Sequence, residues 1–224
     1  MTARFFRRAI DWSDYRAAID LVAPPGVHAP AAAYNIAPSQ VVPLLRRAPE
    51  GEYAPRHSIQ IAPAFWGLVP VWWKKPLSEK KFSTFNARAE TLEDSAAFSG
   101  AFRQGRCLVP ASGFYAWSDG APFAIALKSG DWFCFAGLWS RAMIEGSEFD
   151  TFAIVTTDPN GILAGLSAAS MPVILDRSNW LRWLDTEARD PLALLRPYPS
   201  DAMHGWPANP AVGNVRNQGE DLLG

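Results

Sequence analysis

The 224-residue sequence has few cysteines and histidines and no long hydrophobic run. Its two cysteines, Cys107 and Cys134, are too few for a disulfide framework, and neither belongs to a CxxC pair typical of a zinc site. We expect both to be reduced core residues, because each lies in an apolar stretch. No segment approaches the ~18 consecutive apolar residues of a membrane span, and no hydrophobic segment follows the basic first eight residues. The sequence therefore predicts a cytoplasmic protein with no signal peptide and no membrane helix.

Several motifs of enzymes that use a nucleotide or a metal are also missing. The sequence contains no GxGxxG, no GxxxxGK[ST] and no HExxH, and its three histidines, His28, His57 and His204, are far apart. These absences predict neither a metal site nor a cofactor. Two isolated nucleophiles remain open as hydrolase candidates. Ser167 lies in an incomplete GxSxG string, and Cys107 follows a basic residue that would favour its thiolate.

The charge balance is neutral overall but uneven along the chain. Twenty-one basic and 22 acidic residues give a net charge of −1. Residues 1–120 hold 14 basic and 10 acidic side chains (+4), and residues 121–224 hold 7 and 12 (−5). A basic face on the first half, and with it a polyanionic partner, is therefore compatible with the sequence. The ten tryptophans are large enough to form either a core or a surface on which bases stack.

The pattern of apolar and turn residues predicts one α+β domain over residues 1–224. We expect a largely antiparallel, barrel-like sheet with flanking helices, because strands of period two separated by short turns dominate the second half. The expected strands are residues 41–45, 58–68, 107–117, 122–127, 132–139 and 149–156. The expected helices cover residues 11–22, a segment that begins at 91 or 93 and ends before 105, and a short helix after 160. Two more are expected from 178 to 184 and from 190, where Asp190 caps the helix and Pro191 occupies its first turn. Residues 69–83 are expected to form an exposed loop.

Five strings occur in an order that resembles a known family. They are YNIAPSQ (34–40), WGLVP (66–70), NARAET (86–91), RCLVPASGFYAW (106–117) and MPVIL (171–175). Together they resemble the SOS-response-associated peptidase (SRAP) family, and the likeness runs from Arg4 to about Leu222. The resemblance implies binding of single-stranded or abasic DNA and chemistry at abasic sites.

In that family the exposed N-terminal cysteine traps the opened sugar as a thiazolidine. A glutamate in the GFYEW string and a histidine three places before the Met-Pro pair assist, and the asparagine of NARAE lines the site. This chain departs from the pattern at three of these four positions. Thr2 replaces the cysteine, Ala116 the glutamate and Ala168 the histidine, whereas Asn86 is retained. The resemblance therefore implies a pseudoenzyme whose cross-linking is weakened or lost.

The residue types at the remaining family positions suit a DNA strand. Basic side chains neutralise phosphates, and aromatic rings stack on unpaired bases. From these residue types and the resemblance together, the expected DNA-binding residues are Arg4, Pro38, Ser39, Trp66, Asn86, Arg88, Phe98 and Trp117, with Lys74 and Lys75 as further phosphate contacts. Pro38 and Ser39 are included because they fall where the family's loop approaches the strand. The lysine-rich run 74–81 is equally typical of a solvated loop.

Two alternatives stay open. Removal of Met1 would expose the α-amine of Thr2, whose intrinsic pKa lies near ~7.7–8.0, and this amine could form a Schiff base with an abasic sugar. The protein would then be an active cross-linking enzyme or lyase. The other alternative is a hydrolase that uses Ser167 or Cys107, or an interaction domain that keeps only the fold.

Overall fold

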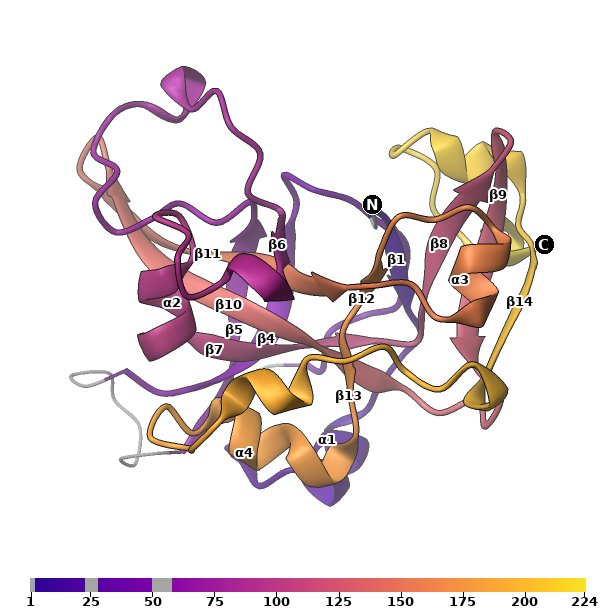
Figure 1. Ribbon diagram of the computed structural model, residues 1–224, viewed down its shortest axis with the longest axis horizontal. Helices are drawn as coiled ribbons and strands as arrows, with labels where there is room; N and C mark the ends of the chain where they lie inside the picture. Colours follow the sequence, from indigo (N-terminus) through magenta and orange to yellow (C-terminus); the bar gives the residue numbers. More distant parts are fainter. Residues whose placement is uncertain (1–2, 23–27, 50–57) are drawn as a thin grey trace.

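The computed structural model describes residues 3–22, 28–49 and 58–224. Five strands form a closed barrel at its centre, in the order β11-β10-β7-β4-β5 and back to β11 (Figure 1). Their bounds are Val41–Arg47 (β4), Ile59–Trp66 (β5), Arg106–Ala111 (β7), Phe133–Ile144 (β10) and Ser147–Thr157 (β11). All neighbouring pairs are antiparallel except the pair that closes the ring, where Phe65 and Trp66 run parallel to Thr151 and Phe152. The predicted barrel-like α+β architecture is confirmed.

The barrel strands are buried on both faces, which explains their nearly continuous apolar sequences. Every residue of β7 is buried. Cys107 and Val109 belong to the cluster inside the barrel, whereas Leu108 belongs to the cluster outside it, because successive side chains point to opposite faces. Cys134 joins the outer cluster. Both cysteines are buried and free, as the sequence predicts, and they lie on different faces of the barrel wall.

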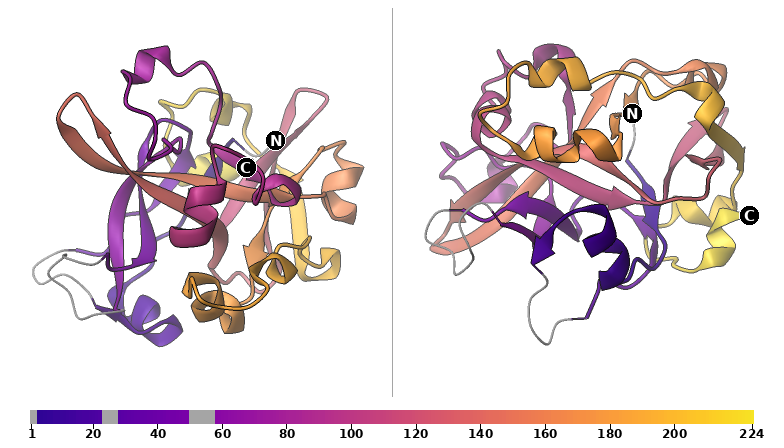
Figure 2. Two further views of the ribbon diagram at one scale, coloured as in Figure 1. Left: turned by 60° about the vertical axis from the view of Figure 1, so that its left-hand side comes forward. Right: turned by 90° about the horizontal axis from the view of Figure 1, so that it is seen from below.

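Three helices cover the outer apolar cluster. They are α1 (Trp12–Ala18), α2 (Ser99–Gln104) and α4 (Trp180–Leu184). Figure 2 shows α1 and α4 near one another on one side of the barrel. Each contributes large buried side chains to the cluster, among them Tyr15, Phe102, Trp180 and Trp183. No helix in the described part of the chain is long and apolar enough to cross a membrane.

A second, five-stranded sheet packs beside the barrel in the order β14-β9-β8-β1-β3. Its strands are Phe5–Arg7 (β1), Ala33–Ile36 (β3), Gly113–Ser118 (β8), Ala121–Leu127 (β9) and Met203–Pro207 (β14). The sequence predicts one strand over residues 107–117, but the chain bends at Ser112 and passes from the barrel into this sheet. Gly113 is required at the bend because a Cβ there would overlap the Phe6 ring and the Ile125 carbonyl oxygen.

Other short elements complete the fold. They are β2 (Leu21–Val22), β6 (Asn86–Arg88), β12 (Met171–Pro172), β13 (Ile174–Leu175), α3 (Gly161–Gly165) and 3-10 turns at Leu77–Glu79, Ala89–Thr91, Arg177–Asn179, Pro191–Leu194, Ser200–Ala202, Pro210–Gly213 and Glu220–Leu223. The Asn160 side chain caps α3 by accepting from the Leu163 N–H at 3.1 Å.

Three sequence expectations need correction. The helix expected from residue 91 or 93 begins only at Ser99. Asp190 makes no capping bond and adopts a left-handed conformation (φ 50°), because only one 3-10 turn follows. The first helix ends at Ala18, and the chain then enters β2. The polar turn expected at residues 50–52 lies outside the described residues.

The glycines of α2 provide a matched stability test. A Cβ at Gly105, the C-cap, would overlap the Trp139 carbonyl oxygen, whereas a Cβ at Gly100 would meet nothing within 4 Å. Gly105→Ala is therefore expected to lower the free energy of unfolding by about 1–3 kcal/mol. Gly100→Ala should leave it unchanged or raise it by about 0.5–1 kcal/mol, because alanine favours helix. Urea unfolding of both variants decides this, and equal midpoints would contradict the overlap.

Candidate functional site

The structure gathers three of the positions singled out in the sequence into one region. Ala116 (β8, 8% exposed) and Ala168, just after α3, belong to the same apolar cluster as Met171. Phe85, next to Asn86, packs against this cluster as well. β6 carries Asn86 and pairs in parallel with β11, opposite Ile154. Segments that are 30–50 residues apart in sequence thus meet at one end of the barrel.

The first described residues approach the same region. β1 pairs antiparallel with β8, Phe5 lying opposite Phe114, and the Tyr115 N–H donates to the Arg4 carbonyl at 3.0 Å. Arg4 therefore lies beside β8, one residue from Ala116. Thr2, the proposed reactive residue, lies outside the described residues.

The positions of the family's acid–base groups hold only methyl groups. Neither Ala116 nor Ala168 can donate or accept a proton, and Ser170 is buried (7% exposed). Proton transfer by positioned side chains contributes ~10²–10⁴-fold to such reactions. Asn86 can hydrogen-bond but does not titrate. Ala116 and Ala168 therefore leave these two positions without a titratable side chain.

Arg4 supplies a cation beside β8, but it lies opposite Tyr115 in the strand pairing and so faces the other side of the sheet from Ala116. Its Nη1 donates to the Ala3 carbonyl at 2.8 Å, and its Nε is buried with no hydrogen-bond partner. Burial lowers the pKa of the Arg4 guanidinium, which remains protonated as arginine does in proteins.

Arg88 supplies a second cation, but carboxylates hold it. Its Nε donates to Glu90 at 3.0 Å, its Nη2 to Asp158 at 3.1 Å and its Nη1 to the Ala169 carbonyl at 3.4 Å. The last bond ties β6 to the segment that carries Ala168. Arg88 was expected from the sequence to contact a phosphate, but its guanidinium already pairs with carboxylates of the protein.

The structure overturns two of the expected base-stacking residues. Trp66 is fully buried, stacked on Phe152 with ring centroids 6.0 Å apart, and its Nε1 donates to the Phe85 carbonyl at 2.8 Å. Phe98 is 9% exposed and belongs to the outer core cluster. Neither ring has a free face for a base, because both fill the core beside the barrel strands.

Trp117 is exposed but belongs to the other face of β8. Its side chain is on the same side as Tyr115, with ring centroids 6.4 Å apart, and opposite to Ala116, because side chains alternate along a strand. The structure does not bring Trp117 together with Ala116 and Ala168.

Pro38 and Ser39 line a cavity of about 440 Å³ beside Trp66. Ser39 adopts a left-handed conformation (φ 71°), and its N–H donates to the Trp66 carbonyl at 2.9 Å. Lys80 lies at the same cavity, and partial burial lowers the pKa of its amine. This part of the expected DNA-binding set does form a concave surface with a cation.

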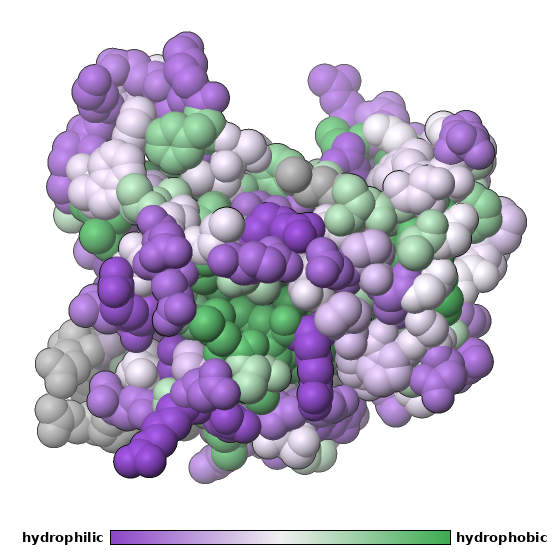
Figure 3. Space-filling view, viewed as in Figure 1, coloured by the Kyte–Doolittle hydropathy of each residue, from purple (hydrophilic) through white to green (hydrophobic). Residues whose placement is uncertain are grey.

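The sequence analysis missed an exposed aromatic group on residues 69–85. This segment projects from the barrel (Figure 1), and Val71, Trp72, Leu77 and Phe82 are 59%, 53%, 36% and 38% exposed. Trp72 contacts Trp73, which contacts Phe82, and the Lys80 amine lies 4.8 Å from the Phe82 ring centroid. The signal was present, since two adjacent tryptophans beside four lysines do not suit a purely solvated loop. In Figure 3 the surface is hollowed beside this projection.

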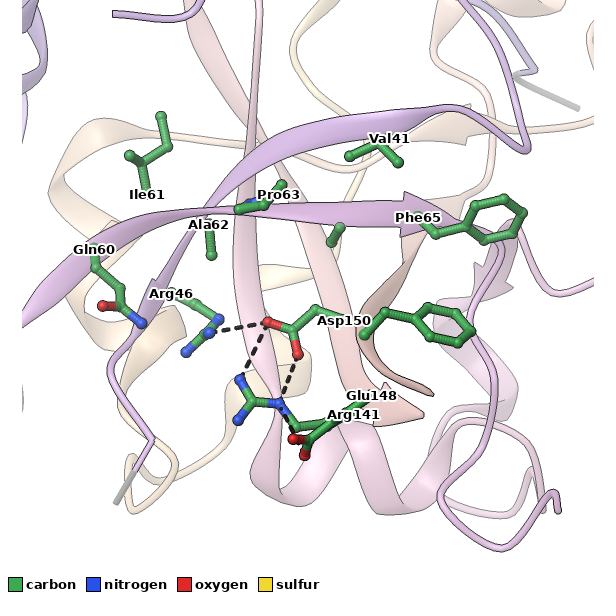
Figure 4. Close-up of a pocket in the computed structure, with 12 residues that line it drawn as sticks. Val41, Arg46, Gln60, Ile61, Ala62, Pro63, Phe65, Arg141, Glu148 and Asp150 are labelled. Atoms are coloured by element: carbon green, nitrogen blue, oxygen red, sulfur yellow. Dashed lines mark hydrogen bonds and ion pairs between the residues drawn. The ribbon is translucent and has the colours of Figure 1, made fainter. Parts of the chain in front are cut away.

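A cavity of about 750 Å³ lies elsewhere, between β5 and the β10–β11 hairpin (Figure 4). There Asp150 accepts from Arg46 at 2.9 Å and from Arg141 at 2.8 Å. The Arg46 and Asp150 side chains are only 3% and 8% exposed, and the Arg46 guanidinium lies 4.4 Å from the Trp139 ring centroid. None of the expected site residues lines this cavity. It contains a buried charge network that holds the barrel wall together.

The hydrolase candidates gain no support. Burial raises the pKa of the Cys107 thiol, so the thiolate is suppressed. Ser167 is exposed with a left-handed backbone (φ 56°), but it follows α3. A nucleophile elbow places its serine between a strand and the helix that follows.

Comparisons with known proteins agree with the family likeness. The family model described as "SOS response associated peptidase (SRAP)" matches residues 1–215. The chain is 34% identical over 215 residues to the abasic site processing protein YoqW of Bacillus subtilis, covering 92% of this chain and 90% of the relative. It is 29% identical over 202 residues to the abasic site processing protein YedK of Escherichia coli, covering 87% and 85%. A solved structure from Bordetella bronchiseptica matches with a TM-score of 0.75 at 24% identity, covering 92% of this chain and 99% of that one, which shows a shared fold.

Proposed function

The chain belongs to the SOS response associated peptidase family, and from this premise we propose that it binds single-stranded DNA at abasic sites, with cross-linking weakened or lost. Membership of this family supports a function related to abasic sites in DNA. The strand preference and the loss of covalent chemistry are the further steps of the proposal. A single domain over residues 1–224 and a cytoplasmic location complete it.

One observation carries the proposal. The region that joins β6, β8 and the segment after α3 keeps the Arg88 cation, with Arg4 on the neighbouring face of β8, while its acid–base positions are Ala116 and Ala168. Phosphate neutralisation supplies most of the affinity for nucleic acid, so binding survives the loss of reactive groups. Proton transfer does not survive it.

The aromatic projection adds a surface for unpaired bases. Trp72 presents more than half of its area to solvent and is fixed by a bond from its Nε1 to the Ala96 carbonyl at 2.9 Å. Stacking on a fixed ring contributes roughly 1–3 kcal/mol per base and does not depend on sequence. The projection and the cavity at Pro38 and Ser39 share Leu77, Ser78 and Lys80 as lining residues, so a strand can contact both.

An active enzyme that uses the Thr2 amine is the second candidate. An amine with a pKa near ~7.7–8.0 is partly neutral at pH 7.5 and can attack an aldehyde. The hydroxyl could close an oxazolidine ring, which should hydrolyse more readily than the thiol product. The retained Asn86 favours this candidate, while the two alanines oppose it.

Fluorescence anisotropy tests these candidates. A labelled single strand with one abasic site is titrated with the protein at low salt and measured again after denaturing detergent. A signal that collapses in detergent supports the non-covalent reader, and one that survives supports Thr2 chemistry. Thr2→Cys is the matched variant for covalent capture. No binding at any salt concentration would overturn the proposed function.

Arg88→Gln is expected to weaken binding of the same strand about 5- to 20-fold at low salt. The slope of the logarithm of the binding constant against the logarithm of salt concentration should become shallower by about 0.7. This is the change expected for one phosphate contact on a single strand. Arg182→Gln on the exposed face of α4 removes the same charge and should leave both values near those of the parent. Equal losses in the two variants would show that only the net charge matters.

A further inference from the structure

In the free protein, three of the five N–H bonds of Arg88 already donate to protein groups. Its three nitrogens donate to Glu90, to Asp158 and to the Ala169 carbonyl, at 3.0, 3.1 and 3.4 Å. A phosphate bound through an adjacent pair of N–H bonds must share the guanidinium with these acceptors, because all five N–H bonds lie in one plane. DNA and the two carboxylates therefore compete for one cation.

The two carboxylates reach Arg88 from different parts of the fold. Glu90 belongs to the 3-10 turn directly after β6, so its pairing is local. Asp158 directly follows β11, whose Thr156 lies opposite Arg88 in the parallel pairing of β6 with β11. The barrel strand thus fixes the distance between Asp158 and Arg88, and Asp158 lies next to any phosphate that Arg88 binds.

The pairing is weak enough to open. The side chains of Arg88, Glu90 and Asp158 are 43%, 47% and 73% exposed. Exposed ion pairs contribute ~0–1 kcal/mol, because water and salt screen them. A phosphate bound through two parallel N–H bonds is a stronger partner. The carboxylates consequently delay and weaken the phosphate contact without preventing it.

We propose that Asp158, with Glu90, forms an acidic clamp on Arg88 that lowers the affinity of this site for the DNA backbone. This inference rests on the proposed function and assigns a specificity-determining role to Asp158. When a phosphate replaces a carboxylate as the partner of Arg88, the negative charge of Asp158 stays beside that phosphate. Repulsion between Asp158 and the phosphate then lowers the affinity for the DNA backbone below the affinity that the arginines alone would give.

The expected size follows from Coulomb's law. A unit charge about 6 Å from the phosphate, in a medium as polar as water, changes the dissociation constant about threefold. Asp158→Asn should therefore tighten binding of single-stranded DNA about threefold at low salt. The log–log salt dependence should become steeper by up to about 0.7, because Arg88 then exchanges a bound anion rather than a fixed carboxylate.

The test compares four proteins by anisotropy with an oligothymidylate and with a single strand that contains one abasic site. They are the parent, Asp158→Asn, the double variant Asp158→Asn/Arg88→Gln and Asp131→Asn. Asp131 is exposed in the turn between β9 and β10, and its change removes the same charge away from the site. The clamp predicts tighter binding and a steeper salt dependence for Asp158→Asn alone, and no gain in the double variant.

The outcomes separate the clamp from the proposed function. If the parent binds and Asp158→Asn binds equally well, the clamp is wrong and the function stands. A gain that persists in the double variant, or that Asp131→Asn reproduces, also overturns the clamp, because the effect would not pass through Arg88. If no variant binds either strand, both the function and the clamp fail.

Discussion

Asp150→Ala is expected to lower the free energy of unfolding by about 3–5 kcal/mol. The Asp150 carboxylate is the anion between two guanidiniums, Arg46 at 2.9 Å and Arg141 at 2.8 Å, and the Arg46 side chain is 3% exposed. Removing the carboxylate takes the Asp150 counter-charge away from a buried cation. The loss falls at the cavity between β5 and β11, beside their short parallel pairing.

Urea unfolding measures this loss, and Glu148→Ala is the matched control. Glu148 approaches Arg141 only to 3.8 Å, and its side chain is 55% exposed. Its removal should change the free energy of unfolding by less than about 1 kcal/mol. A loss of the same size in the two variants would show that the network acts as a surface ion pair.

Trp72→Ala is expected to weaken binding of single-stranded DNA by about 5- to 150-fold, the loss of one stacked base at roughly 1–3 kcal/mol. The ring is 53% exposed, and its bond to the Ala96 carbonyl fixes its orientation before DNA arrives. Anisotropy at constant salt measures the effect. The salt dependence should stay unchanged, because no phosphate contact is lost.

Trp117→Ala provides the comparison, because Trp117 is also exposed and was an equally good candidate in the sequence. It lies on the face of β8 opposite Ala116, so its removal should alter the dissociation constant by less than about twofold. Both variants should keep their unfolding midpoints close to that of the parent. A loss at Trp117 with none at Trp72 would reverse the assignment of the stacking surface.

The strands and turns of the second half could be predicted because their signals are local. The pairs Asp119-Gly120 and Glu145-Gly146 both adopt positive φ angles, as two-residue hairpin turns require, and each lies between two strands that the sequence predicts. Asn160 caps α3 as its position suggests. Short strands such as β1 and β14 were not predicted, because their pairing depends on partners about 30 to 110 residues away.

The candidate site likewise has some features that the sequence predicts and others that only the packing decides. Residue types alone indicate which positions can react, so the sequence by itself shows that Ala116 and Ala168 carry no titratable group. Which aromatic rings face solvent is a property of packing. The sequence cannot distinguish Trp66, buried against Phe152, from Trp72, exposed on the projection, because an indole suits a core and a stacking surface equally well.

By itself the sequence determined the α+β class, the main barrel strands and the family, and it shows that Ala116 and Ala168 carry no titratable group. The tertiary structure alone decided that Arg88 is held by Asp158 and Glu90, that Asp150 joins two arginines in the barrel wall, and that Trp72 rather than Trp66 is exposed. The reason is physical. Composition and periodicity report the preferences of single residues and near neighbours, whereas ion pairs and burial depend on which distant segments the closed barrel brings together.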